Sequence, residues 1–313
     1  MCLIVSGKGN KFIAKKNIIV YKQLEGGSFC GYVTSHQNFP VKLNSEIVPK
    51  GKIELRSYGS KQCLDRGAIH AYAIIPRPGI YFKAIIKKGT EFWIQDDLTQ
   101  IAAEKLYLTD KKAFYKHSKP TDFSDYLKEG VDVYLKDGRR CKITDSFDKK
   151  DVIGVYGYDN QVIALEYKYS RFFNEELPNE ISKNNFIEEN SCNRRELITK
   201  LEKDLDGYGN TKQLKDLGIK SDALDYCESL GKNWYIPSSG ELKKVFKNQL
   251  RINITLQYLG IPQIDFRWFW SSTLGSSQYT WDYCGDGGDW CYDGFDCFNV
   301  RYYRSVLPFL ELS

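Results

Sequence analysis

The side chains best suited to chemistry are concentrated in one stretch near the C-terminus, from Tyr279 to Val300. Its carboxylate side chains are Asp282, Asp286, Asp289, Asp293 and Asp296, and its thiols are Cys284, Cys291 and Cys297. Tyr, Phe and Gly fill most other positions, and Lys, Arg, Glu, Gln and Met are absent. A solvated loop rarely carries so many aromatics, and a buried strand rarely carries so many carboxylates. Both together on an exposed segment are typical of a binding surface.

Metal binding is an alternative use of these residues. The three cysteines contain no C-x-x-C spacing, and the histidines of the chain lie far away in the N-terminal part, at His36, His70 and His117. Zinc is therefore disfavoured, and we interpret the thiols as free. Oxygen ligands for calcium could come from Asp286, Asp289, Asp293 and Asp296. Their spacing is not that of an EF-hand, but a calcium-dependent carbohydrate-binding protein stays open as an alternative. No other cofactor is expected.

Catalysis by these thiols is not expected. A reactive thiolate needs a neighbouring base or cation, and no histidine or basic residue lies within the stretch. We therefore assign no catalytic residue and predict a non-enzymatic protein.

Composition limits the class of protein. The chain has 313 residues, of which 42% are hydrophobic, and no apolar run is long enough to cross a bilayer. Its first residues lack a basic region followed by a long apolar region, so we predict no secretory signal, synthesis in the cytoplasm and no membrane insertion. Nine scattered cysteines do not suggest a disulfide framework. Two domains fit this length.

The charge is uneven along the chain. Residues 1–120 hold 20 Lys and Arg against 9 Asp and Glu, a net charge of +11, whereas residues 279–300 carry −5. The lysines of the basic part are spread out, and no RNA-binding aromatic motif accompanies them. We expect a solvated basic surface and no nucleic-acid partner.

The N-terminal part has the pattern of a β-rich domain over residues 1–122. Strands are predicted at 17–24, 79–86 and 91–94, a short helix at 98–106, and a linker at 111–125. This domain is interpreted as an accessory or anchoring domain. A homo-oligomer formed through it stays open.

The second domain, residues 123–313, is predicted to position the Tyr279–Val300 stretch. Asp137-Gly138 and Asp159-Asn160 each separate two apolar segments, which predicts two successive hairpins over 131–165. Helices are predicted from Ser191, from Ser221 or Asp222 to Gly231, and after Ser238, where Glu241 has capping-box spacing. One or two more turns are predicted at 252–259. Strands are predicted at 267–273 and towards 309.

Several segments of this domain recur in one known family. They are Trp234-Tyr-Ile-Pro-Ser-Ser-Gly-Glu-Leu242, Trp270-Ser-Ser-Thr273, Val300-Arg-Tyr-Tyr-Arg-Ser-Val-Leu-Pro-Phe309, and Asp206-Gly207 with Asn210-Thr211. They resemble bacterial and phage proteins with the C-type-lectin fold, in the branch akin to the formylglycine-generating enzyme. The resemblance covers about the last 190 residues. It implies an α+β fold of antiparallel sheets with two to four helices. An enzyme like that relative is a further, less favoured alternative.

Within that family, the Tyr279–Val300 stretch resembles the variable proteins of diversity-generating retroelements, which include phage tropism determinants. Mutagenesis of adenines in Asn codons gives Asn, Asp, Tyr, Cys, Gly, Phe and Ser but not Lys, Glu, Gln, Met or Trp. Residues 282–299 match this set apart from Trp290. The resemblance therefore implies a hypervariable, solvent-exposed surface at about 279–305 that binds a receptor.

The resemblance assigns roles to individual residues. The expected ligand-binding residues are Tyr279, Asp282, Tyr283, Cys284, Asp286, Asp289, Cys291, Tyr292, Asp293, Phe295, Asp296, Tyr302, Tyr303 and Ser305. The expected scaffold residues are Trp234, Pro237, Glu241, Trp270, Ser271, Ser272, Trp281 and Trp290. The expected partner is a protein or glycan on a target surface, basic or rich in hydroxyls because of the five aspartates. Assembly into a phage virion and display by a non-classical route are both open.

Overall fold

The structure is a computed structural model that describes residues 3–5, 11–26, 32–34, 40–49, 54–58, 61–126, 131–145, 147–158, 160–175, 186–189, 192–265, 267–285 and 295–312. The chain divides into two compact units, Met1–Lys128 and Glu129–Ser313, called here the N-terminal and C-terminal units. The expected boundary was between residues 122 and 123. None of the described helices is both long and apolar enough to span a membrane.

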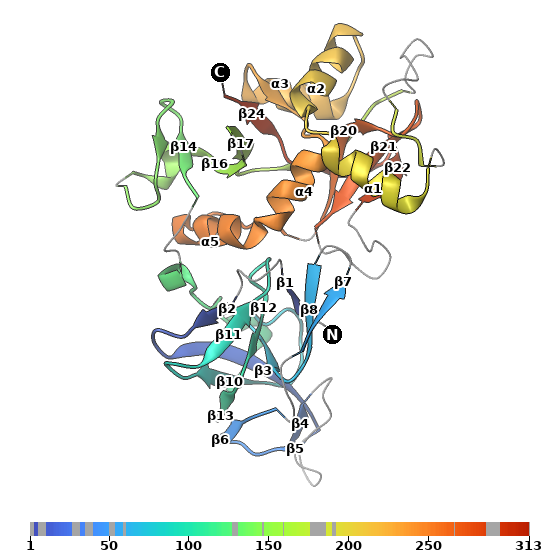
Figure 1. Ribbon diagram of the computed structural model, residues 1–313. Coiled ribbons are helices and arrows are strands. Elements are labelled where there is room, and N and C mark those ends of the chain that lie inside the picture. Colours follow the sequence, from blue (N-terminus) through green and yellow to red (C-terminus); the bar gives the residue numbers. More distant parts are fainter. Residues whose placement is uncertain are drawn as a thin grey trace. The chain divides into compact units, whose positions relative to one another are not determined.

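The described part of the N-terminal unit consists mainly of strands (Figure 1). They are β1 (Leu3–Val5), β2 (Lys11–Ile13), β3 (Ile18–Gly26), β4 (Tyr32–Thr34), β5 (Pro40–Val41), β6 (Ser45–Ile47), β7 (Glu54–Tyr58), β8 (Lys61–Arg66), β9 (Ile69–Tyr72), β10 (Tyr81–Ile86), β11 (Glu91–Ile94), β12 (Gln100–Ala103) and β13 (Leu106–Ala113). The main sheet has the order β2-β11-β12-β9-β3-β10-β13-β6, with β4 beside β3 and β5 beside β4. Strands β1, β8 and β7 form a second sheet.

Two predictions for this unit are wrong. The segment 98–106 is not a helix, because Ile101 and its neighbours are buried in β12, which pairs with β11 after a turn closed between Gln95 and Leu98. The segment 111–125 is not a linker. Tyr21 donates its hydroxyl to the Lys119 carbonyl, and Thr121 donates to the Ile19 carbonyl, so this segment packs onto the sheet.

The C-terminal unit combines two sheets with helices and is therefore α+β. Its strands are β14 (Val133–Leu135), β15 (Arg140–Cys141), β16 (Val152–Tyr158), β17 (Gln161–Ala164), β18 (Lys168–Arg171), β19 (Trp234–Tyr235), β20 (Trp268–Leu274), β21 (Tyr279–Cys284), β22 (Phe295–Asn299), β23 (Tyr303–Val306) and β24 (Phe309–Glu311). Its helices are α1 (Arg194–Lys203), α2 (Gly207–Asp216), α3 (Asp222–Leu230), α4 (Ser239–Lys247) and α5 (Gln249–Leu259). One sheet has the order β15-β14-β16-β17-β24-β19, and the other β18-β23-β20-β21-β22.

The local signals of this unit are largely confirmed. Both predicted hairpins form, as β14–β15 and β16–β17, and Gly138 has the positive φ of 87° that its turn requires. Ser221 caps α3, and Gly231 follows its last residue. The first helix starts at Arg194, three residues after the predicted Ser191, because Asn193 is its cap.

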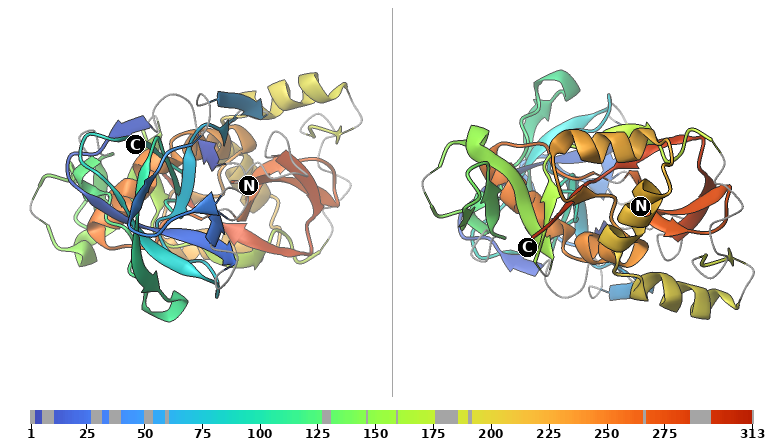
Figure 2. Two further views of the ribbon diagram at one scale, coloured as in Figure 1. Left: turned by 90° about the horizontal axis from the view of Figure 1, so that it is seen from below. Right: turned by 90° about the horizontal axis from the view of Figure 1, so that it is seen from above.

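The C-terminal unit was expected to contain two to four helices, but its described residues include five. Helix α2 was not predicted, because Gly207 and Gly209 weaken its pattern. The Asp206 carboxylate stabilises its start by accepting from the Gly209 N–H. Helices α2 and α3 contact β18, β19 and β20 (Figures 1 and 2) and share a core with Trp234 and Trp270.

Candidate binding surface

The Tyr279–Val300 stretch enters the five-stranded sheet as β21 and β22. Asp282 lies directly opposite Asp296 on β22 and opposite Trp270 on β20. On the other side of β20, the short strand β23 runs parallel to it and pairs with β18. Neighbouring strands therefore bring residues 168–171 and 303–306 into the same sheet as the predicted binding stretch.

The tryptophans hold the sheet from within. Trp270 and Trp281 are both fully buried, and each ring N–H donates to a backbone carbonyl, of Ser170 and Ile187 respectively, at 2.8 Å. Ser271 donates to the Trp281 carbonyl at 2.6 Å. These contacts are those of scaffold residues, since a buried ring N–H needs such a partner.

A second junction, at Glu241, joins α4 to the six-stranded sheet. Its carboxylate accepts from the Ser238 N–H at 2.8 Å, completing a capping box, from Gln161 at 2.6 Å and from the Tyr235 hydroxyl at 3.2 Å. Burial raises the pKa of Glu241 to about 7. A Cβ at Gly207 would lie 2.3 Å from this carboxylate, so the Asp206-Gly207 pair is explained by close packing.

The other scaffold residues that the structure describes are buried as well. Trp234 is 5% exposed, Ser272 is buried, and the Pro237 carbonyl accepts from the Ser272 N–H at 2.8 Å. This bond ties the segment before α4 to β20.

Five of the expected ligand-binding residues are buried, so the expectation that they are exposed is wrong. They are Asp282, Tyr283, Cys284, Phe295 and Ser305, each at most 4% exposed. Tyr283 stacks on Phe246 of α4, with ring centroids 5.2 Å apart, and meets Phe295 edge-on at 5.1 Å. The Lys243 ammonium lies over both rings and pairs with Glu202 at 3.1 Å. Helix α4 therefore covers this part of the stretch, and these side chains belong to the hydrophobic core.

Asp282 is buried in a different environment, against the Arg304 side chain. Its Oδ2 lies 3.1 Å from Arg304 Nε, and the Arg304 guanidinium lies 3.9 Å from the centre of the Phe298 ring and 5.6 Å from that of Trp268. Burial raises the pKa of Asp282 to about 8, although Arg304 acts in the opposite direction. This carboxyl therefore serves Arg304 and cannot also face a ligand.

The exposed side chains of the sheet are tyrosines accompanied by arginines. Tyr279, Tyr302 and Tyr303 are 42%, 58% and 53% exposed, and Asp296 is half-buried. Tyr302 packs edge-on against Phe298 at 5.1 Å, and the Arg171 guanidinium lies 5.1 Å from the centre of the Tyr303 ring. We call this set the tyrosine–arginine surface, and it includes both faces of the sheet, because Tyr303 and Arg304 are consecutive in β23 and point to opposite faces. It comprises Tyr169, Arg171, Tyr279, Asp296, Phe298, Tyr302, Tyr303 and Arg304.

Several members of this surface were not predicted from the sequence. Tyr169 is 53% exposed on β18, more than 100 residues before the stretch in the chain. Arg171 and Arg304 were not predicted either. The Arg-Tyr-Tyr-Arg run at 301–304 is a signal for Arg304, whereas no local pattern links Arg171 to the stretch.

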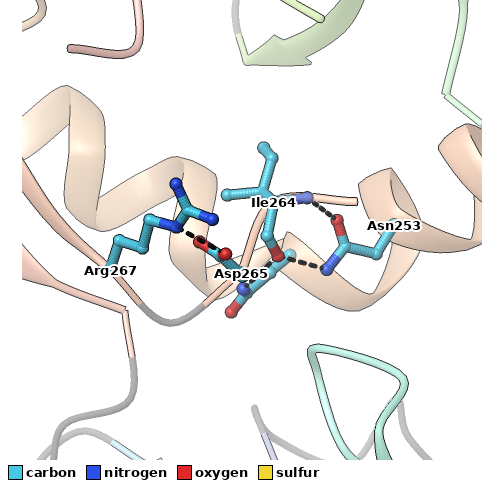
Figure 3. Close-up of polar contacts among 5 residues, drawn as sticks. Asn253, Ile264, Asp265 and Arg267 are labelled. Atoms are coloured by element: carbon cyan, nitrogen blue, oxygen red, sulfur yellow. Dashed lines mark hydrogen bonds and ion pairs between the residues drawn. The ribbon is translucent and has the colours of Figure 1, made fainter. Parts of the chain in front are cut away.

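The loop before β20 brings a third arginine to this region (Figure 3). Asn253 holds the Ile264 backbone from both sides, with its Nδ2 2.8 Å from the carbonyl and its Oδ1 2.8 Å from the N–H. The next residue, Asp265, pairs with Arg267 at 2.6 Å. The Arg267 guanidinium in turn lies 4.9 Å from the Tyr167 ring centre and 5.5 Å from that of Tyr169. Arginine–aromatic contacts therefore extend along β18.

Six predicted residues lie outside the described part of the chain: Asp286, Asp289, Trp290, Cys291, Tyr292 and Asp293. Nothing is concluded about them. Among the described residues, no group of three or more His, Cys, Asp or Glu side chains could hold a metal ion. Burial raises the pKa of the Cys297 thiol to about 12.

Comparisons with known proteins identify no family for this chain. No protein-family model and no curated protein matches the chain. A solved structure with partial similarity is that of a fimbrial protein from Bacteroides ovatus ATCC 8483, with 13% identity and a TM-score of 0.44 over 94% of this chain. The chain spans 64% of the length of that protein. A similarity of this extent supports no functional argument.

Proposed function

We propose that the C-terminal unit is a non-enzymatic binding domain that recognises a protein or glycan on a target surface through the tyrosine–arginine surface. The observation that carries this proposal is the exposure of Tyr302 and Tyr303, each of which also packs against a neighbouring side chain of the same sheet. Tyrosine offers a large contact area at a low cost in rotamer entropy, and arginine adds directed hydrogen bonds.

The order of the motifs on the elements supports a C-type-lectin-like fold. The segment from Trp234 to Leu242 contributes β19 and the start of α4, Trp270 lies in β20, and the last motif contributes β23 and β24. In this proposal the sheet that carries β20 to β23 is the lectin-like binding sheet. Retroelement diversification of its exposed positions is part of the same proposal.

The burial of each side chain indicates which positions could vary without disrupting the fold. Replacing Tyr279, Tyr302 or Tyr303 would leave the core intact, whereas replacing Tyr283 or Phe295 would open a cavity under α4. The diversified set proposed here therefore excludes the buried residues of β21 and β22. A near-repeat of the coding segment beside a reverse-transcriptase gene, differing at the exposed codons, would support diversification.

Two of the described thiols are poorly suited to nucleophilic catalysis. Burial raises the pKa values of Cys227 and Cys297 to about 12, so both thiols stay protonated at neutral pH. A protonated thiol is a poor nucleophile.

The test is a binding screen of the full chain against arrays of bacterial surface proteins and glycans. For any partner found, replacing both Tyr302 and Tyr303 by Ala should weaken binding by about tenfold or more. The matched control is Tyr258→Ala, which removes a tyrosine that is 52% exposed on α5. Equal affinity of the double variant and the wild type would refute the assigned surface.

A further inference from the structure

A pocket of about 410 Å³ lies between α2 and β20, apart from the residues of the tyrosine–arginine surface. Its polar lining includes Asp204, Asp206, Asn210 and Ser272, and its apolar lining includes Leu214 and Leu217. No Lys or Arg is among the described residues that line it. Two carboxylates therefore face a cavity whose described walls carry no positive charge.

Asp204 is held by neutral donors. Thr273 donates to its carboxylate at 2.5 Å, the Asn210 Nδ2 at 3.2 Å and the Asp206 N–H at 3.3 Å. These bonds fix the carboxylate without neutralising it, and no described residue forms an ion pair with it. These three donors take most of the lone pairs of this carboxylate, so it contributes charge to the pocket more than free acceptor positions.

The pocket offers hydrogen-bond acceptors beyond this carboxylate. Asp206 uses Oδ1 to accept from the Gly209 N–H at 2.9 Å, and Asn210 uses its Nδ2 on Asp204, so each keeps a further acceptor oxygen. Ser272 is 2% exposed, and its Oγ has no partner among the described residues. A buried hydroxyl without a partner is unfavourable, which suggests that this site is completed by a bound molecule.

These features together specify the chemistry of the ligand. An ammonium group has three donors, no acceptor and a positive charge, and it matches a pocket with acceptors and net negative charge. The leucines suit the methylene chain behind such a group. We propose that this pocket binds a primary alkylammonium, either as a small free amine or as a lysine side chain of a partner protein.

The proposal is independent of the proposed function, and its test uses the full chain. Pentylamine and its neutral isostere pentanol are titrated separately and followed by chemical shifts or calorimetry. We expect pentylamine to bind and pentanol to bind at least about tenfold more weakly. Lysine-containing and acetyl-lysine-containing peptides, compared in the same way, distinguish a free amine from a lysine side chain as the source.

Matched variants locate the site. Asp206→Asn removes one charge but keeps a good helix cap, so α2 should remain folded while pentylamine affinity falls about tenfold. Asp216→Asn removes the same charge from the exposed end of α2 and should leave affinity unchanged. Ser272→Ala should weaken binding less, by roughly threefold, since a neutral hydrogen bond is lost.

Three results would overturn the proposal. They are equal binding of amine and alcohol, equal affinity of Asp206→Asn and Asp216→Asn, and no saturable binding of either pentylamine or the lysine peptide. Thermal unfolding of each variant checks that a loss of pentylamine binding is not caused by unfolding of the protein.

Discussion

Tyr283 and Tyr302 are the same residue type, 19 positions apart in one aromatic-rich region, yet they are 1% and 58% exposed. Tyr283 lies beneath α4, stacked on Phe246, while Tyr302 lies just before β23 and packs only its edge against Phe298. Exposure is therefore set by the element that covers each strand and not by local composition. A segment with the composition of a binding surface can therefore supply both exposed residues and the core beneath them.

The largest expected effect concerns the buried member of this pair. Tyr283→Ala should reduce the free energy of unfolding by about 3–5 kcal/mol, because a large ring is removed from a packed site. Tyr302→Ala should change it by less than about 0.5 kcal/mol. Urea unfolding of both variants measures the difference. Similar losses would show that the two tyrosines are not separated into core and surface.

The next effect concerns the loop that positions Arg267. Asn253→Ala should cost about 2 kcal/mol, because the Ile264 N–H loses the Asn253 carbonyl as its acceptor in a buried site. The Ile264 carbonyl keeps its bond from Gln249 at 2.9 Å. Gln263→Ala, in the same loop, serves as the control and should cost less than about 0.5 kcal/mol. A negligible cost for Asn253→Ala would mean that the loop is held by other contacts.

The third effect depends on pH and concerns Asp282, which is buried opposite the half-buried Asp296. Because the folded pKa of Asp282, about 8, exceeds its ordinary value of 3.8, the folded state holds the proton longer. The contribution of this group to stability is therefore complete below pH 4 and declines as the pH rises to 8. Asp282→Asn mimics the protonated form and should be more stable than the wild type at pH 8, by at least about 1 kcal/mol.

Unfolding of Asp282→Asn and of the wild type between pH 4 and pH 8 measures this effect. A stability difference between Asp282→Asn and the wild type that stays constant over this range would contradict the assignment of the raised pKa to Asp282.

The smallest expected effect concerns the exposed positions. Tyr302→Ser and Tyr303→Asp, both among the residues that adenine mutagenesis of Asn codons provides, should each shift stability by no more than about 0.5 kcal/mol. Thermal unfolding is sufficient to detect a larger change. A clear loss at either position would argue against free variation there.

Local signals in the sequence predicted much of the fold of the C-terminal unit. Gly138 and the Ser221 cap are short-range features, and both lie where the sequence placed them. Long-range packing could not be predicted in the same way. The burial of Tyr283 depends on Phe246, and that of Asp282 depends on Arg304, residues that no local pattern links to them.

Long-range contacts also explain why α2 and the arginines of the tyrosine–arginine surface could not be predicted from local sequence patterns. Helix α2 depends on the Asp206 cap and on packing against β19 and β20, which compensate for its two glycines. Arg171 reaches Tyr303 because β18 pairs with β23 across more than 130 residues of chain. A composition-based prediction locates the region but not the side chains that complete it.

The packing of Tyr283 against Phe246 and Phe295 has a consequence for making combinatorial libraries on this scaffold. A library that randomises Tyr169, Tyr279, Tyr302 and Tyr303 should yield mostly folded clones, because these side chains are exposed. Extending the randomised codons into 282–284 should cause most clones to unfold, so nominal diversity would rise while the number of usable binders falls.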